Sequence, residues 1–144
     1  MLDNPRTTST RARDKDPDSK IGIVLPLKGS NNGFFRQSST LLEQTVSNMK
    51  NLLLTVKGER VAQPTFGCNL FNCLFENFDA DFDNKIIESI REAVATWLPH
   101  VVLNNIQVDS QQDRNTVSVS VAFSLATAPN ATESLTLNLL RAVR

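Results

Sequence analysis

The chain has no excess of either charge, because its 15 Lys and Arg side chains balance 15 Asp and Glu side chains. A neutral chain offers no general electrostatic attraction to nucleic acid or to an anionic membrane, so we expect neither as a partner. Its apolar runs are far shorter than the ~20 residues that a membrane-spanning helix requires. The first residues also lack the apolar core of a signal peptide. We therefore expect a soluble protein that is not exported by that route.

Side chains that bind metals are scarce as well. Cys68 and Cys73 are the only cysteines, and His100 is the only histidine. A zinc site needs about four ligands at short, paired spacings, and a catalytic Cys-His pair would require distant residues to meet in space. Two buried free thiols in a reducing cytoplasm are the favoured interpretation. We expect no metal and no other cofactor.

The 144 residues are enough for one domain with a core of its own, since 40% of them are hydrophobic and 21% are charged. Residues 1–19 differ from the rest, because their interleaved basic and acidic side chains show no apolar periodicity. Such a segment cannot offset the entropy of ordering by burial. We expect a single domain over residues 20–144, preceded by an arm over residues 1–19 that is either disordered or ordered by a neighbouring subunit.

Two segments have the spacing of long amphipathic helices. The first begins with the capping box of Thr40 and Glu43. Its predicted apolar stripe consists of Leu42, Val46, Met49 and Leu53. The second begins in an acidic segment around Asp81, where carboxylates complement the helix dipole, and ends before Pro99. Its predicted core face consists of Phe82, Ile86, Ile90, Val94 and Trp97.

Alternating apolar and polar residues predict the strands. The strongest alternation covers residues 117–125, and a weaker strand around residues 102–108 is interrupted at Asn104. Residues 20–27 also alternate, but Pro26 within them lacks an N–H group, so this strand lies at an edge or ends there. A loop over residues 126–132 leads to a last alternating segment over residues 134–140, whose leucines leave a helix possible.

These elements predict an α+β fold in which a mainly antiparallel sheet of three to four strands packs on two long helices. Between the helices, Gly58 can take the positive φ that ends a helix, and Pro64 fixes its own φ. Glu59 and Arg60 are flanked by apolar residues, so we expect them to be partly buried. A buried Glu59 would have to be paired with an arginine such as Arg60 or Arg91.

A specific pattern runs through this connector and the short helix predicted over residues 69–76. The pattern consists of Leu53-Leu54-Thr55, Gly58-Glu59-Arg60, Pro64, Phe66-Gly67, Leu70 and Leu74-Phe75-Glu76. It resembles the baseplate wedge proteins of contractile phage tails, the lysozyme-like tail family that includes the type VI secretion baseplate component and the sheath initiators. The resemblance covers residues 38–125. Many members carry a Glu-Pro-Arg triplet where this chain has Leu98-Pro99-His100, so the triplet's role in docking onto the wedge core carries over only to Pro99.

The resemblance implies a structural component of the virion tail baseplate, assembled in the host cytoplasm and present in six copies per baseplate. Its expected partners are other wedge proteins and the tail sheath protein, whose first ring it would template by strand addition. The motif residues implied to bind partners or to shape the fold are Gly58, Glu59, Arg60, Pro64, Phe66, Gly67, Leu70, Phe75, Glu76 and Pro99. The predicted sheath-docking strand consists of Ser134, Leu135, Thr136, Leu137, Asn138 and Leu139.

The lysozyme-like name raises an enzymatic alternative, a tail enzyme that degrades the cell wall. Glycoside hydrolysis needs two carboxyl groups about 5 to 9.5 Å apart, and Glu59 with Glu76 is the only pair that we nominate. Each has a structural explanation, an arginine partner for Glu59 and the end of a short helix for Glu76. We therefore expect no catalytic activity, and a cell-wall turbidity assay separates the two classes.

Overall fold

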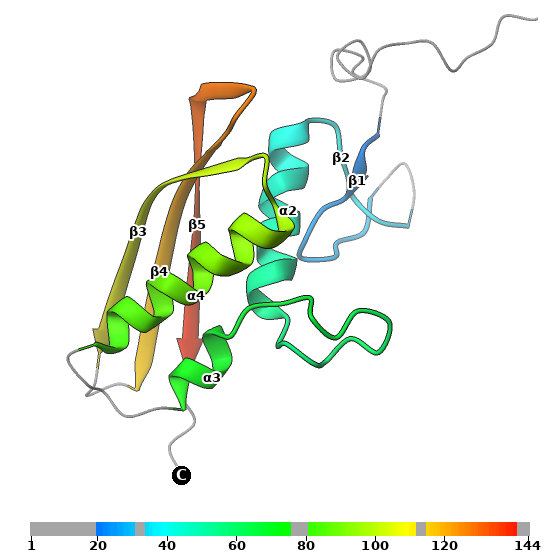
Figure 1. The fold of residues 1–144 in the computed structure, drawn as a ribbon. Helices are drawn as coiled ribbons and strands as arrows, with labels where there is room; N and C mark the ends of the chain where they lie inside the picture. Colours follow the sequence, from blue (N-terminus) through cyan, green and yellow to red (C-terminus); the bar gives the residue numbers. More distant parts are fainter. Residues whose placement is uncertain (1–19, 31–33, 76–80, 112–114, 141–144) are drawn as a thin grey trace, which may run out of the picture. The chain divides into compact units, whose positions relative to one another are not determined.

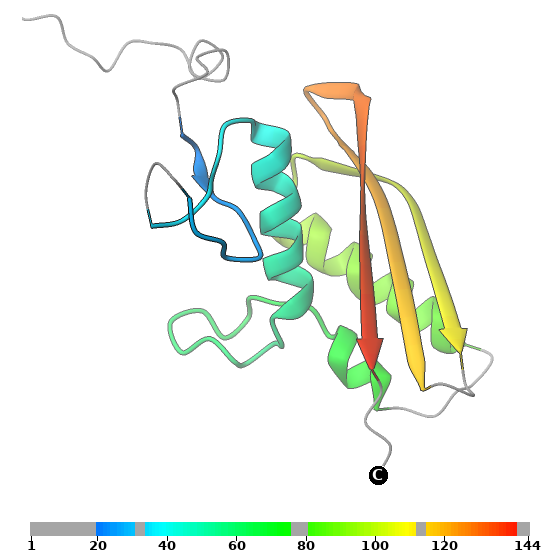
Figure 2. The same ribbon diagram turned by 180° about the vertical axis from the view of Figure 1, so that it is seen from behind.

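The computed structural model describes residues 20–30, 34–75, 81–111 and 115–140, and Figures 1 and 2 show it from opposite sides. Its elements, in chain order, are β1 (Gly22–Ile23), β2 (Gln37–Ser38), α2 (Leu41–Leu54), α3 (Leu70–Leu74), α4 (Phe82–Trp97), β3 (Val101–Gln111), β4 (Thr116–Leu125) and β5 (Ala128–Leu140). They belong to two compact units that divide within α2, between Asn48 and Met49. The predicted arm over residues 1–19 lies outside the described residues, and the single domain over residues 20–144 stays a prediction.

The second unit is built on a three-stranded antiparallel sheet in the order β3-β4-β5. Helix α4 lies over one face of this sheet and packs on β3 (Figures 1 and 2). The core-facing side chains of the central strand are fully buried, and these are Val117, Val119, Val121 and Phe123. The predicted α+β class, with a mainly antiparallel sheet and two long helices, α2 and α4, is confirmed.

Helix α4 follows the sequence pattern closely. Phe82, Ile86, Ile90 and Val94 are buried, and Trp97 is half-buried. The helix ends at Trp97, two residues before Pro99, and Leu98 caps it by donating its N–H to the Val94 carbonyl at 2.8 Å. Pro99 cannot continue a helix, because its ring would clash and it has no N–H.

The pairing of the strands shows two irregularities. Leu103 pairs with Phe123 and Asn105 with Ala122, so Asn104, where the sequence pattern is interrupted, forms a bulge. The predicted loop over residues 126–132 is wrong in extent, because the turn comprises only Ala126 and Thr127 and β5 begins at Ala128. Residues 129–131, which contain Pro129, have no partner on β4. From Ser134 to Leu140 the pairing is continuous, so the last segment is a strand and not a helix.

The predicted stripe of α2 is only partly right. Met49 and Leu53 are buried together with Leu52, whereas Leu42 and Val46 are half-buried. Two polar residues are buried instead, Thr45 and Ser47. Each hydroxyl donates to a carbonyl one turn earlier, Thr45 to Leu41 at 2.8 Å and Ser47 to Glu43 at 3.3 Å. Because helix carbonyls satisfy these hydroxyls, the side chains can leave water without a lost hydrogen bond.

In the first unit, β1 pairs with β2 over only two residues, Gly22 with Ser38 and Ile23 with Gln37. The strand predicted over residues 20–27 is therefore much shorter than its alternation suggests. Its apolar side chains remain largely exposed, with Ile23 at 45% and Leu27 at 58%. Alternation reports which side chains share a face, but not whether another segment covers that face.

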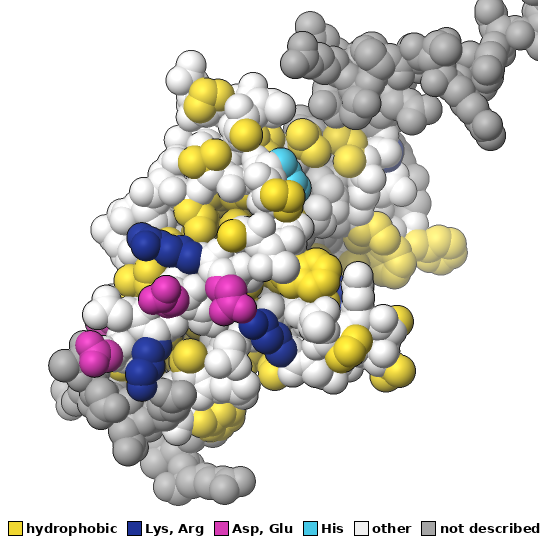
Figure 3. Space-filling model, viewed as in Figure 1, with side chains coloured by type: hydrophobic (Ala, Val, Ile, Leu, Met, Phe, Trp, Pro, Cys, Tyr) yellow, Lys and Arg dark blue, Asp and Glu magenta, His cyan; other side chains and the backbone are white. Residues whose placement is uncertain are grey.

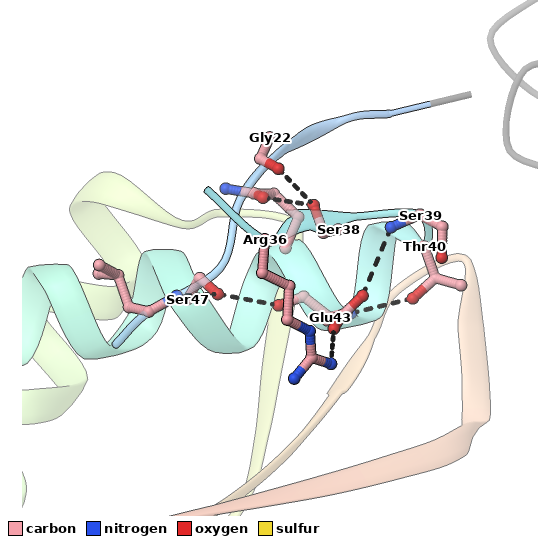
Figure 4. A network of polar contacts seen from close by, with 9 residues as sticks. Gly22, Arg36, Ser38, Ser39, Thr40, Glu43 and Ser47 are labelled. Carbon is pink, nitrogen blue, oxygen red and sulfur yellow. Dashed lines mark hydrogen bonds and ion pairs between the residues drawn. The ribbon is translucent and has the colours of Figure 1, made fainter. Parts of the chain in front are cut away.

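A polar network fixes β2 against the start of α2 (Figure 4). The buried Ser38 hydroxyl donates to Gln44 Oε1 at 2.6 Å, and Arg36 forms an ion pair with Glu43 at 2.8 Å. Thr40 Oγ1 accepts the Glu43 N–H at 3.2 Å, which is one half of the predicted capping box. The Glu43 carboxylate accepts from Ser39 N at 3.4 Å and not from Thr40 N, so the second half is shifted by one residue.

Candidate docking surfaces

The connector after α2 is a loop that is closed at its base. Val56 and Cys68 form a parallel bridge, and Cys68 donates its N–H to the Thr55 carbonyl at 2.9 Å. Within the loop, Gly58 N donates to the Pro64 carbonyl at 2.7 Å. Gly58 and Gly67 have positive φ values of 95° and 127°, which is the conformation predicted for Gly58. The motif glycines therefore shape a defined loop.

Arg60 lies between an amide and an aromatic ring. Its guanidinium donates to Asn51 Oδ1 at 2.9 Å and stands 4.0 Å from the centroid of the Phe66 ring. Phe66 in turn meets Trp97 edge to face, with ring centroids 5.1 Å apart. This stack ties the loop to the end of α2 and to the end of α4. A cation over an aromatic face is attracted by the ring quadrupole, and aromatic rings favour this edge-to-face geometry.

The predicted buried pair of Glu59 with an arginine is wrong. Glu59 is exposed, and its Oε2 accepts the Val56 N–H at 3.2 Å. The ion pairs of Arg36 with Glu43 and of Lys57 with Glu92 do not include Glu59. The carboxylate is satisfied by a backbone donor just beyond the helix end. The arginine has an aromatic ring and an amide as partners. An ion pair between the two neighbouring charged residues is therefore not required.

We expect Glu59→Ala to lower the free energy of unfolding by less than about 1 kcal/mol, because an exposed hydrogen bond contributes little. Loss of a buried ion-pair partner would cost about 3 to 5 kcal/mol. Urea unfolding of the variant, beside Glu133→Ala as an exposed control in β5, distinguishes the two values. A loss of 3 kcal/mol or more would contradict the exposed geometry.

The remaining motif residues fall into two groups. Leu70 is fully buried at the start of α3. Pro64, Phe75 and Pro99 are exposed, Phe75 at 66%. Glu76 lies outside the described residues, so the nominated Glu59–Glu76 pair is not placed. The exposed group is available to partners, whereas Gly58, Phe66, Gly67 and Leu70 shape the loop and the core.

The C-terminal candidate segment is an edge strand. β5 has β4 on one side in the order β3-β4-β5. Leu135, Leu137 and Leu139 are at most 8% exposed, while Ser134, Thr136 and Asn138 are exposed. On the outer face, Ser118 donates to Asn138 Oδ1 and the Ser120 and Thr136 hydroxyls share a hydrogen bond, both at 3.1 Å. The strand and its two faces are confirmed, and its role in sheath docking stays a prediction.

The exposed side of α4 carries charges of both signs (Figure 3). A pocket of about 610 Å³ lies there, lined by Lys57, Asn69, Cys73, Asp81, Asn84, Lys85, Glu88, Ser89 and Glu92. Lys57 and Glu92 form an ion pair across 3.1 Å. Within the described ranges, no group of three or more His, Cys, Asp or Glu side chains is arranged to hold a metal, and Cys68 and Cys73 are buried free thiols. None of the described helices is long and apolar enough to span a membrane.

Sequence reasoning missed three residues. Asn51 and Trp97 are the outer partners of the Arg60–Phe66 stack, and only the apolar face of α4 gave a signal, for Trp97. Phe34 was not singled out, although it is 94% exposed. The sequence before it carries the turn signal Asn31-Asn32-Gly33, and such a signal alone does not tell whether an aromatic side chain is covered.

Comparison with known proteins gives one consistent answer. A family model described as baseplate wedge protein gp25 matches residues 39–130. Baseplate wedge protein gp25 of Enterobacteria phage T4 is 29% identical over 98 residues, which cover 68% of this chain and 74% of the T4 protein.

Solved structures share the fold at lower identity. A Geobacter sulfurreducens protein named as a tail lysozyme has a TM-score of 0.66 at 19% identity, over 74% of this chain and 96% of that chain. A chain of the type VI secretion baseplate complex has a TM-score of 0.58 at 9% identity, over 72% and 95%. A chain of the anti-feeding prophage baseplate has a TM-score of 0.56 at 15% identity, over 84% and 85%.

Proposed function

This chain belongs to the baseplate wedge protein gp25 family, and we propose that it templates the first ring of sheath subunits in a contractile tail. Family membership makes it a structural baseplate component of a contractile tail or injection system. The partners in this proposal are other wedge proteins and the sheath protein. Six copies per baseplate are supported by the 6-fold symmetry of the anti-feeding prophage baseplate, and the chain would assemble in the host cytoplasm before the tail is complete.

The observation that supports templating is the continuous edge of β5. Seven successive residues, from Ser134 to Leu140, pair with β4 without a register shift. The three core leucines hold this register, because a slip of one residue would turn all of them to the outer face. An edge strand in fixed register presents regularly spaced backbone groups. A strand from a sheath subunit could add to them, with main-chain hydrogen bonds giving affinity and alternate side chains giving specificity.

The other edges fit this role less well. The edge of β3 is interrupted by the bulge at Asn104 and carries the charge of Asp109, two devices that protect edges from unwanted pairing. In the described part of the first unit, the strands are β1 and β2, each of two residues. Their ladder is too short to fix the register of a partner.

We expect Thr136→Pro to block sheath polymerisation while the chain stays folded and still enters the baseplate. Proline removes a backbone donor, and losing a few ladder bonds at about 1 kcal/mol each weakens docking more than it weakens a packed core. Electron microscopy should show baseplates and bare tubes without sheath, and Asn138→Pro should behave alike. The matched control is Ala131→Pro, since Ala131 has no partner on β4.

The outcomes of this experiment separate the alternatives. Normal sheaths on Thr136→Pro tails would place the templating edge elsewhere. A variant that fails to fold, judged by its melting curve, would show that this strand serves the core and not the docking site.

The enzymatic alternative has weaker support. Its carboxylate nominee Glu59 is exposed on the loop and accepts the Val56 N–H, and the second nominee, Glu76, lies outside the described residues. The name of the Geobacter sulfurreducens protein describes that protein, and at 19% identity the likeness shows the fold alone. A structural role is therefore the function that we propose.

A further inference from the structure

The outer edge of β5 lacks the features that protect an open strand from pairing with another chain. Strand β5 lies at one side of the sheet (Figure 2). Between Ser134 and Leu140 it has no charged residue, no proline and no register shift against β4, and these are the usual protective devices. Within the described ranges, the backbone hydrogen bonds formed outside the helices and strand ladders do not involve this segment. The edge is therefore open to a further strand.

The sequence of this edge is complementary to itself when one copy is reversed. Leu135 and Leu139 lie two residues to either side of Leu137, and the residues at 136 and 138 are both polar. Read in steps of two from Glu133 to Arg141, the sequence is Glu-Leu-Leu-Leu-Arg. Its two ends carry opposite charges. A second copy that runs in the opposite direction therefore matches leucine with leucine and an acid with a base.

We propose that two copies of the chain, outside a baseplate, pair antiparallel through β5 about a two-fold axis at Leu137. Facing residues of an antiparallel pair lie on the same side of the sheet, so the leucine rows of the two copies join. This register sets the exposed Glu133 opposite Arg141 of the second copy, and the symmetry forms this pair twice. An axis at Thr136 or Asn138 would set a charge opposite a leucine instead. Three strands from each copy form one continuous sheet.

This pairing has a consequence for sheath docking. The second copy bonds to the same backbone groups that a sheath strand would use, so one edge cannot hold both. The dimer keeps the edge covered until the chain enters a baseplate, because an uncovered edge invites pairing with unrelated strands. The contact between the two copies does not depend on the proposed function, whereas its effect on sheath docking rests on it.

The first test reverses the charges and measures mass by sedimentation equilibrium. The intact chain should sediment with twice the mass of one copy. Glu133→Arg should weaken association about tenfold or more, because like charges then face each other at two places. Adding Arg141→Glu to this variant should restore the dimer, since the reversed charges attract again. The matched control is Asp109→Arg, which reverses an exposed acid on β3 at the other side of the sheet and should leave the mass unchanged. A monomeric wild-type chain, or a double variant that stays as dissociated as Glu133→Arg, would overturn the proposal.

The second test fixes the register with single cysteines on separate chains. Positions 136 and 138 of two copies face each other in the proposed pair, within the Cα separation that a disulfide spans. Oxidation of a mixture of Thr136→Cys and Asn138→Cys should therefore link one chain of each kind, whereas each variant alone should link much less. The native Cys68 and Cys73 are buried and do not compete. Equal linking in the mixture and in the separate samples would overturn the register.

The sheath experiment separates this inference from the proposed function. A monomeric wild-type chain whose Thr136→Pro variant still loses the sheath would overturn the dimer and leave templating by β5 standing. A dimeric chain with normal sheaths on Thr136→Pro tails would contradict templating by β5 and leave the dimer standing.

Discussion

Replacing Gly67 by alanine is expected to lower the free energy of unfolding by about 3 to 5 kcal/mol. Gly67 has a φ of 127°, and a Cβ built on it would lie 2.5 Å from the Thr55 carbonyl oxygen and 3.1 Å from Lys57 N. Both contacts are with backbone atoms, which cannot rotate away as a side chain does. The carbonyl of Thr55 also accepts the Cys68 N–H that closes the loop. At Gly67, the energetic cost of backbone strain therefore adds to the cost of displacing the hydrogen bond that closes the loop.

Two other glycines separate these causes. Gly58 also has a positive φ, but a Cβ there meets nothing within 4 Å, so Gly58→Ala should cost only the conformational strain of about 1 to 2 kcal/mol. Gly29 has neither feature, and Gly29→Ala should change stability by less than about 0.5 kcal/mol. Urea unfolding of the three variants gives the order directly. If Gly67→Ala and Gly58→Ala lowered the free energy of unfolding equally, the close approach to Thr55 would make no contribution to stability.

Phe123→Ala is expected to cost about 3 to 5 kcal/mol, the range for removing a large aromatic side chain from a core. Phe123 is 0% exposed on β4, the strand with neighbours on both sides, where it pairs with Leu103 and Glu133. The cavity would open on the core-facing side of the central strand. Surrounding side chains belong to regular elements on both sides and have little freedom to collapse into it.

Phe75→Ala provides the matched control, because Phe75 is the same residue type in the same unit but is 66% exposed. Its loss should lower stability by less than about 1 kcal/mol. Thermal unfolding of the two variants under identical conditions gives the comparison. A small effect of Phe123→Ala, similar to that of Phe75→Ala, would contradict a tightly packed core beneath β4.

Local patterns predicted those elements whose burial is decided within one segment. The alternation from Val117 to Leu125 and the spacing from Phe82 to Val94 both gave the correct element and the correct buried face. Asn104, where the alternation of the weaker strand is interrupted, is exposed and lies at the register shift of β3. In each case one face of the segment packs on the elements next to it. The periodicity of the apolar residues therefore shows which face is buried.

The errors arose where contacts come from elsewhere in the chain. The Glu59–Arg60 pair was expected from adjacency, but Arg60 binds Asn51 and Phe66, whose positions only the folded loop determines. Thr45 and Ser47 are buried against expectation, because helix carbonyls satisfy their hydroxyls. The alternation from Ile21 to Leu27 predicted a longer strand than the two residues that pair. The docking role proposed for β5 depends on the surface of another protein, which no pattern in this sequence records.

The order of contacts in the second unit has a consequence for how the chain folds. Its principal contacts join neighbours in sequence, α3 with α4, α4 with β3, β3 with β4, and β4 with β5. Each step closes only a short loop, so little chain entropy is lost before the next contact forms. Contacts between elements that are adjacent in sequence form with a smaller loss of chain entropy than contacts between distant ones, which favours faster folding. A subunit that folds quickly exposes the apolar edge residues of β5 for only a short time before its core is complete, which limits pairing between unfinished copies.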